Sequence, residues 1–99
     1  MKNPLIKIVK DKYLEYGWTV IEVPPGEVND LIAGKGTKLH FVCVEDKNRN
    51  NFIQNAFSNG AVPVYARVDE IKQKVSFENI NLHERVIIGR AERKKKIIT

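Results

Sequence analysis

One stretch of the chain, residues 29–47 (NDLIAGKGTKLHFVCVEDK), carries the residues whose types and spacing could do chemistry. Asp30 opens a short apolar run, and an alternating segment further on ends in Glu45, Asp46 and Lys47. In an extended strand the side chains of Glu45 and Lys47 lie on the same side, because side chains alternate with a period of two. Carboxylate oxygens are ligands that Mg²⁺ prefers. The stretch therefore raises the question of whether it forms a metal site.

Other common kinds of site are missing from the sequence. The segment GKGTK at residues 34–38 has neither the length nor the lysine placement of a phosphate-binding P-loop. Cys43 is the one cysteine, so the chain has no CxxC pair for zinc and no obvious partner for a thiol nucleophile. His40 lies between two apolar residues, on the strand side opposite Cys43, and we expect it to be a strand histidine rather than a metal ligand. We expect no small-molecule cofactor.

The first part of the chain predicts a helix and a strand. Asn3 followed by Pro4 is typical of a helix start, and Gly17 is typical of a helix end. Apolar residues recur at helical spacing between them, which predicts a helix over residues 4–16. Residues 18–23 then alternate with β-branched residues until a Pro-Pro-Gly sequence stops the pattern, as expected for a strand.

The opening stretch itself predicts a β-hairpin. Residues 31–33 and 38–45 have the composition of strands, and Gly34, Lys35 and Gly36 between them indicate the turn. Beyond the hairpin the sequence predicts a helix carrying Phe52, Ile53, Ala56 and Phe57, a strand over 62–68, a short helix over 69–75, and at 86–88 either a last strand or part of a solvated segment.

This order of elements is typical of an α/β sandwich, in which a mixed β-sheet is flanked by helices. The second helix would cross over between two parallel strands. The length of 99 residues suits one domain, which we assign to residues 1–89, followed by a basic C-terminal tail over residues 90–99. The aromatic residues at core-like positions are Trp18, Phe41, Phe52, Phe57 and Phe77.

Three segments of the chain, in this order, resemble a known superfamily. They are YLEYGWTVIEV, NDLIAGKGTKLHFVCVEDK and, after a helix, NGAVPVYARV. Together they cover roughly residues 4–68 and are similar to the restriction-endonuclease-like PD-(D/E)xK nucleases, most closely to the archaeal-type Holliday junction resolvases. The resemblance implies that Asp30 opens the second strand, and that a carboxylate and a lysine lie two residues apart on the third strand. The carboxylates would bind Mg²⁺, and the lysine would orient the attacking water.

Two registers of the third strand are compatible with this pattern. The hairpin length usual in the resolvases puts Cys43 at the carboxylate position and Glu45 at the lysine position, which disrupts the site because a neutral thiol is a poor ligand for a hard cation. A shift of two residues instead matches Glu45 and Lys47 to the motif and requires a longer hairpin. In that second register Asp30, Glu45 and Lys47 are the candidate catalytic residues, and Asp30 and Glu45 are the candidate Mg²⁺ ligands.

The first helix departs from the pattern in both registers. Resolvases carry a metal-binding glutamate early in this helix, where the present sequence has Leu5, Ile6 and Lys7. Asp11 and Glu15, the acidic residues of the helix, lie too near its end. The resemblance therefore implies a catalytically impaired relative of the nucleases.

The charge of the chain favours binding to polyanions. Seventeen Lys and Arg residues against twelve Asp and Glu residues give a formal net charge of +5. Lysine and arginine bind phosphates without a metal, so we expect a protein that binds duplex or branched DNA with little sequence preference and a steep salt dependence. The candidate phosphate contacts are Lys35, Lys38, Lys47, Arg49, Arg90, Arg93, Lys94, Lys95 and Lys96.

Two alternatives for function stay open. One is an active Mg²⁺-dependent endonuclease or junction resolvase, and the other is a structural or packaging protein that binds DNA or a protein partner. Since resolvases act as twofold dimers and the apolar residues 86–88 have no assigned partner, we expect a homodimer. The single cysteine and the lack of a signal peptide or a long apolar segment predict an intracellular protein, cytoplasmic or nuclear, that is neither secreted nor membrane-bound.

Overall fold

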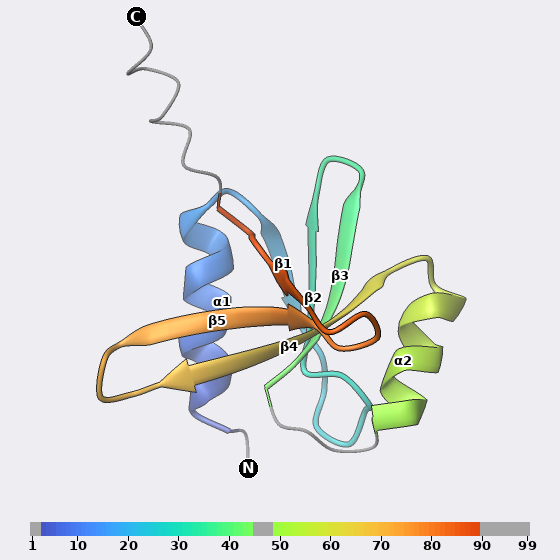
Figure 1. The fold of residues 1–99 in the computed structure, drawn as a ribbon, viewed down its shortest axis with the longest axis horizontal. Helices are drawn as coiled ribbons and strands as arrows, with labels where there is room; N and C mark the ends of the chain where they lie inside the picture. Colours follow the sequence, from blue (N-terminus) through green and yellow to red (C-terminus); the bar gives the residue numbers. More distant parts are fainter. Residues whose placement is uncertain (1–2, 45–48, 90–99) are drawn as a thin grey trace, which may run out of the picture.

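The structure, a computed structural model, describes residues 3–44 and 49–89 (Figure 1). Its elements in chain order are α1 (Leu5–Glu15), β1 (Thr19–Glu22), β2 (Leu31–Lys35), β3 (Lys38–Cys43), α2 (Arg49–Ser58), β4 (Val62–Asp69), β5 (Lys74–Asn79) and β6 (Glu84–Val86). The strands of this part of the chain form one sheet in the order β1-β2-β3-β4-β5-β6. β3 and β4 are parallel and the other neighbours are antiparallel, so the prediction of a mixed sheet is confirmed.

The helix predicted over residues 4–16 is confirmed, and both ends follow the sequence signals. The Asn3 side chain accepts a hydrogen bond from the N–H of Leu5 at 2.8 Å, which satisfies one of the donors left open at a helix start. At the other end Gly17 has a φ of 85°, and the N–H of Trp18 returns to the carbonyl of Tyr13 at 3.1 Å. This is the geometry of a Schellman motif, and it directs the chain from α1 into β1.

The predicted hairpin is formed by β2 and β3, but its turn lies later than predicted. Lys35 pairs with Lys38, so Gly34 and Lys35 belong to the ladder. The turn is formed by Gly36, whose φ is 62°, and Thr37. Only two residues connect the strands, which makes this the tightest common hairpin connection.

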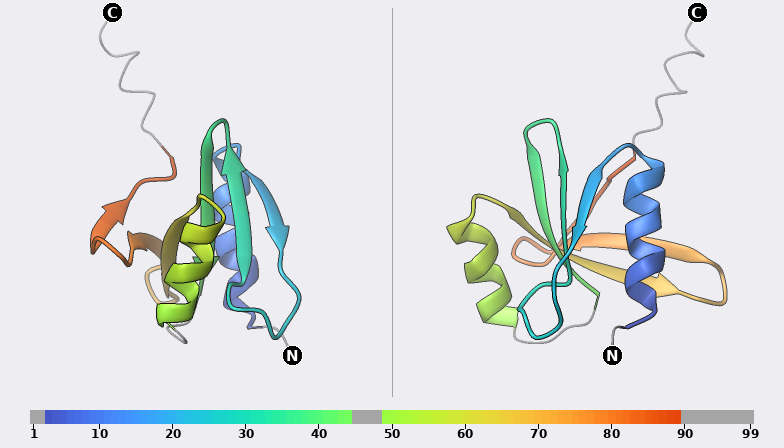
Figure 2. Two further views of the ribbon diagram at one scale, coloured as in Figure 1. Left: turned by 90° about the vertical axis from the view of Figure 1, so that its right-hand side faces the viewer. Right: turned by 180° about the vertical axis from the view of Figure 1, so that it is seen from behind.

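The two helices cover opposite faces of the sheet, as Figures 1 and 2 show. On the face of α1 the core includes Val9, Tyr13, Trp18, Leu31, Val42, Val64 and Phe77. On the face of α2 it includes Phe41, Cys43, Phe52, Ala56 and Ile80. The prediction of a core position is wrong for Phe57, which is 55% exposed on the outer side of α2. Within the described residues, no helix is long and apolar enough to cross a membrane.

The short helix predicted over residues 69–75 is wrong, because this segment is the turn of a second hairpin. The Asp69 carboxylate accepts a hydrogen bond from the N–H of Lys72 at 3.1 Å, and Gln73 has a positive φ of 57°. β5 follows directly and pairs with β4 along its whole length. Side-chain capping of the turn and the alternation of Val75 and Phe77 toward the core of α1 explain why a hairpin forms there.

Two of the apolar residues 86–88 are part of the domain's own core, while the third, Ile87, is 57% exposed. Val86 ends β6 and packs, like the buried Ile88, against the core on the α1 face, so the predicted last strand is confirmed up to Val86. The indole N–H of Trp18 donates to the carbonyl of Ile88 at 2.8 Å. At Gly89 an added Cβ would collide with the ring of Tyr16. The premise of the dimer prediction, that these residues lack a partner, is therefore wrong for Val86 and Ile88.

Candidate functional site

Asp30 connects three segments of the chain at the end of β3. Its carbonyl accepts from the N–H of Val23 at 3.0 Å, and its own N–H donates to the carbonyl of Val42 at 2.8 Å. Its carboxylate accepts from the N–H of Val44 at 2.8 Å. One carboxylate oxygen is therefore already used to hold the end of the strand.

Cys43, the last residue of β3, lies between Val42 and Val44, to which Asp30 is hydrogen-bonded. Its side chain is 2% exposed and belongs to the core on the α2 face. The thiol donates to the carbonyl of Val28 at 3.1 Å, so it has a hydrogen-bond partner in its buried position. The residue next to Asp30 on the neighbouring strand is thus a buried, neutral group.

An amide network that the sequence analysis missed lies beside this pair. Asn29 is buried, and its side-chain oxygen accepts from the side-chain amide of Asn55 on α2 at 3.2 Å. This contact fastens the loop before β2 to α2. The two asparagines are 26 positions apart, and nothing in their local sequence signals the contact.

The described residues around Asp30 do not form a recognisable metal site. Residues 3–44 and 49–89 contain no cluster of three His, Cys, Asp or Glu residues suited to a metal ion. Among the described residues, Cys43 offers a thiol at the position beside Asp30, and a neutral thiol is a poor ligand for Mg²⁺. Of the three predicted catalytic residues only Asp30 is described, because Glu45 and Lys47 lie outside the described residues.

The start of α1 offers apolar side chains where the resemblance would require a glutamate. Leu5 and Ile6 are partly buried and pack against the core on the α1 face. Lys7 points outward and pairs with Asp11 at 2.9 Å in an exposed ion pair. These residues serve the packing and the surface of the helix.

The predicted phosphate contacts that the structure describes are spread over both ends of the molecule. Lys35 and Lys38 pair with each other at the tip of the first hairpin. Lys35 is five residues from Asp30 along β2, so the hairpin tip lies roughly 17 Å from Asp30. The ammonium group of Lys35 donates to the carbonyl of Tyr16 at 2.7 Å, at the end of α1. Arg49 begins α2, at the opposite end of the molecule from the hairpin tip in Figure 1. The other predicted contacts, Lys47, Arg90, Arg93, Lys94, Lys95 and Lys96, lie outside the described residues.

His40 is a buried residue on the α1 face, as expected for a strand histidine. Its Nδ1 lies 2.9 Å from the hydroxyl of Tyr13, and its ring lies 4.5 Å from that of Trp18. Burial, with a smaller contribution from the charge of Lys38, lowers the pKa of His40 to about 4. Burial also raises the pKa of the Tyr13 hydroxyl. Both groups are therefore neutral at pH 7 and serve the core.

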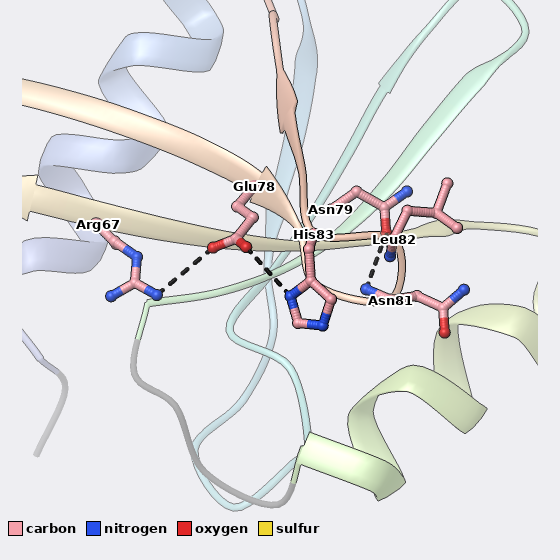
Figure 3. A network of polar contacts seen from close by, with 6 residues as sticks. All are labelled: Arg67, Glu78, Asn79, Asn81, Leu82 and His83. Carbon is pink, nitrogen blue, oxygen red and sulfur yellow. Dashed lines mark hydrogen bonds and ion pairs between the residues drawn. The ribbon is translucent and has the colours of Figure 1, made fainter.

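A polar cluster on β4, β5 and the following turn was also missed (Figure 3). Arg67 reaches Glu78 at 3.5 Å, and the ring of His83 approaches the same carboxylate at 3.6 Å. The guanidinium of Arg67 also lies 4.7 Å from the centroid of the Tyr65 ring, a cation–π distance. The cluster depends on the pairing of β4 with β5, so it could not be found without predicting β5.

Comparison with known proteins identifies a similar fold. No protein-family model matches the chain, and no curated protein matches it. Among solved structures, Hjc, a Holliday junction resolvase from the archaeal hyperthermophile Archaeoglobus fulgidus, is similar with a TM-score of 0.65. The similarity covers 82% of this chain and 80% of that chain, at 17% sequence identity.

The class of fold follows from the topology and this similarity. The chain has the restriction-endonuclease-like α/β fold of the archaeal resolvases, with a mixed sheet between helices, and the fold prediction is confirmed. At 17% identity the similarity defines the fold alone, because one fold supports many functions and these depend on the residues of the site.

Proposed function

We propose that the protein binds double-stranded or branched DNA through phosphate contacts on a resolvase-like scaffold whose metal site has been lost. The scaffold is that of the junction resolvase described above. The binding groups in this proposal are exposed lysine and arginine side chains, which hold phosphates by charge and need no metal.

The observation that carries the proposal is the position of Cys43. Asp30 is hydrogen-bonded to the residues on either side of Cys43, and a two-residue turn joins β2 to β3. This short hairpin supports the register in which Cys43 occupies the carboxylate position of the motif. A shift of two residues would require a longer connection between the strands.

The chemistry at that position argues against tight Mg²⁺ binding. A buried thiol that donates to a backbone carbonyl brings no negative charge and no oxygen to a cation. Leu5 and Ile6 lie at the start of α1, where the resemblance would require a metal-binding glutamate, so this carboxylate is missing as well. Asp30 alone would leave the ion with a single carboxylate at most from these three places.

Two assays on the same substrates test the proposal. Fluorescence anisotropy with a labelled four-way junction and a matched duplex, at salt concentrations from about 50 to 300 mM, should show binding that weakens steeply as salt rises. Incubation of junction and supercoiled plasmid with Mg²⁺ or Mn²⁺ should give no cleavage. Absence of binding to both DNAs at the lowest salt would contradict the proposal.

The variant Asp30→Asn serves as the control for the cleavage assay. The asparagine keeps an oxygen that can accept from the N–H of Val44, so the fold should be preserved while the charge is removed. Metal-dependent cleavage by the original protein that disappears in Asp30→Asn would establish an active endonuclease instead. Continuous coverage of long DNA, without a defined footprint, would indicate a packaging protein.

A further inference from the structure

We propose that the open face of β4, β5 and β6, with Arg67, Lys74 and Arg85, is the surface that contacts the DNA backbone. This inference rests on the proposed function and specifies where binding occurs. None of the three residues was among the phosphate contacts predicted from the sequence. The surface formed by these three residues is called the β4–β6 face below.

The β4–β6 face lies on the same side of the sheet as Cys43. Cys43 pairs with Tyr65 across the parallel strands, and both side chains pack with the core on the α2 face. Arg67 follows Tyr65 by two residues along β4, so the alternation of the strand puts it on that same side. The position beside Asp30 and the guanidinium of Arg67 therefore share one face of the sheet.

Cross-strand pairing brings the other two cations to this face. Arg67 is opposite Ser76, and Lys74 lies two residues before Ser76 on β5. Glu78 lies two residues beyond Ser76 in the other direction and is opposite Arg85 on β6. Directly paired residues of an antiparallel ladder have their side chains on the same side. Since two residues along a strand span about 7 Å and neighbouring strands lie about 5 Å apart, the three cations form a triangle over three strands and lie within roughly 15 Å of one another.

The helices leave the β4–β6 face open to solvent. α1 packs against the other side of β4 and β5, through Val68, Val75 and Phe77. α2 packs near the beginning of β4 and beside β3, and Figures 1 and 2 show the second hairpin extending away from it. The side chains of Arg67, Lys74, Ser76 and Arg85 are exposed. Within the described residues, no helix covers this part of the sheet.

Arg67 is held in a defined position while most of its surface stays accessible. The side chain is 60% exposed, and its guanidinium lies 4.7 Å from the centroid of the Tyr65 ring. It also reaches a carboxylate oxygen of Glu78 at 3.5 Å (Figure 3). A guanidinium carries five N–H donors in a planar fork that fits phosphate oxygens. The contact with Glu78 is long for a hydrogen bond, so the N–H groups of the guanidinium stay available for a bidentate contact with a phosphate.

The charges of the face favour a polyanion over a polycation. Arg67, Lys74 and Arg85 provide three positive charges, and Asp69 and Glu78 on the same side provide two negative ones. The Asp69 carboxylate is used in the turn, where it accepts from a backbone N–H. Glu78 is shared between Arg67 and His83 and should weaken the attraction for phosphate.

Charge substitutions with opposite expected signs test the inference. We would measure anisotropy on the labelled junction and duplex across salt for Arg67→Ala, Lys74→Ala and Arg85→Ala. Each variant should bind several-fold more weakly at low salt, with a salt slope smaller by about 0.9. Glu78→Gln should instead bind more tightly, because it removes the carboxylate next to Arg67.

Lys7→Ala is the matched control, because it removes one positive charge from an exposed position on α1, on the other side of the sheet. It should leave the salt slope unchanged. Circular dichroism and thermal unfolding would verify that all variants are folded. If the original protein binds DNA and the variants of the β4–β6 face behave like Lys7→Ala, the inference is wrong and the proposed function stands. If the original protein does not bind DNA at all, the proposed function fails as well.

Discussion

The two faces of the sheet use their polar residues in different ways. On the α1 face the polar groups of Tyr13, Trp18 and His40 are paired with one another or with backbone, inside a core of stacked rings. On the α2 face Asp30 and Cys43 satisfy backbone groups at the strand end, and charged residues of β4 to β6 remain exposed. The polar groups of the α1 face are therefore used up within the fold, while the α2 face carries both a core and exposed charges, to which we assign the proposed DNA binding.

The largest expected effect comes from removing a ring from the α1 face. Trp18→Ala deletes a side chain that is 3% exposed and leaves a cavity next to Tyr13, and it should lower the free energy of unfolding by about 3–5 kcal/mol. Urea denaturation at pH 7 measures this loss. Phe57→Ala, on the outer side of α2, is the control and should change stability by less than about 0.5 kcal/mol. Equal losses in the two variants would contradict the assignment of the core.

The next effect is a dependence of the stability on pH, which arises from His40 on the α1 face. The folded protein holds the pKa of His40 near 4, below the ordinary value of 6.5, so protonation favours the unfolded chain. Stability should be constant above pH 6.5 and should fall as the pH drops through 6.5 toward 4, by up to about 3 kcal/mol. Denaturation midpoints between pH 8 and 4 measure it.

Substitution of each histidine identifies the source of this dependence. His40→Gln should be less stable at pH 7 and should lose most of the decline between pH 6.5 and 4. His83→Gln, at an exposed position beside Glu78, should keep the decline. A decline that survives His40→Gln unchanged would assign the effect to other groups.

The smallest expected effect is the shift in melting temperature that Mg²⁺ produces in a variant of the α2 face. Cys43→Glu introduces a carboxylate beside Asp30, at the position where the resemblance implies one. The variant should be less stable than the original protein without metal, because the side chain is larger, charged and buried. Addition of Mg²⁺ should raise the melting temperature of Cys43→Glu by a few degrees and leave the original protein unchanged. A rise of equal size in the original protein would indicate a metal site that the described residues lack.

The sequence was sufficient to predict the elements whose ends are marked by capping residues or turn glycines. Asn3 and Gly17 mark the ends of α1, and the alternating segments around the glycines of the first hairpin mark β2 and β3. The second hairpin could not be predicted in this way, since its turn has Gln73 rather than glycine at a positive φ. Once β5 was missed, the pairing of Arg67 with Ser76 and the contact of Arg67 with Glu78 were missed as well.

For the candidate site, the sequence was sufficient to identify residues but not the residues that they contact in the fold. Asp30 was identified as the residue that opens the second strand, and Cys43 as a departure from the motif. That Asp30 binds the backbone on both sides of Cys43 is a long-range relation that no local pattern encodes. The same holds for Lys35, whose contact with the carbonyl of Tyr16 joins a hairpin tip to a helix end.

The close approach of Gly89 to the ring of Tyr16 places a steric condition on the residue type at position 89. Any larger residue at this position would push the ring outward and disturb the corner at which α1 passes into β1, including the indole of Trp18 that holds Ile88. The absence of a side chain at position 89 is thus what lets the last described residues of the chain lie against the end of the first helix.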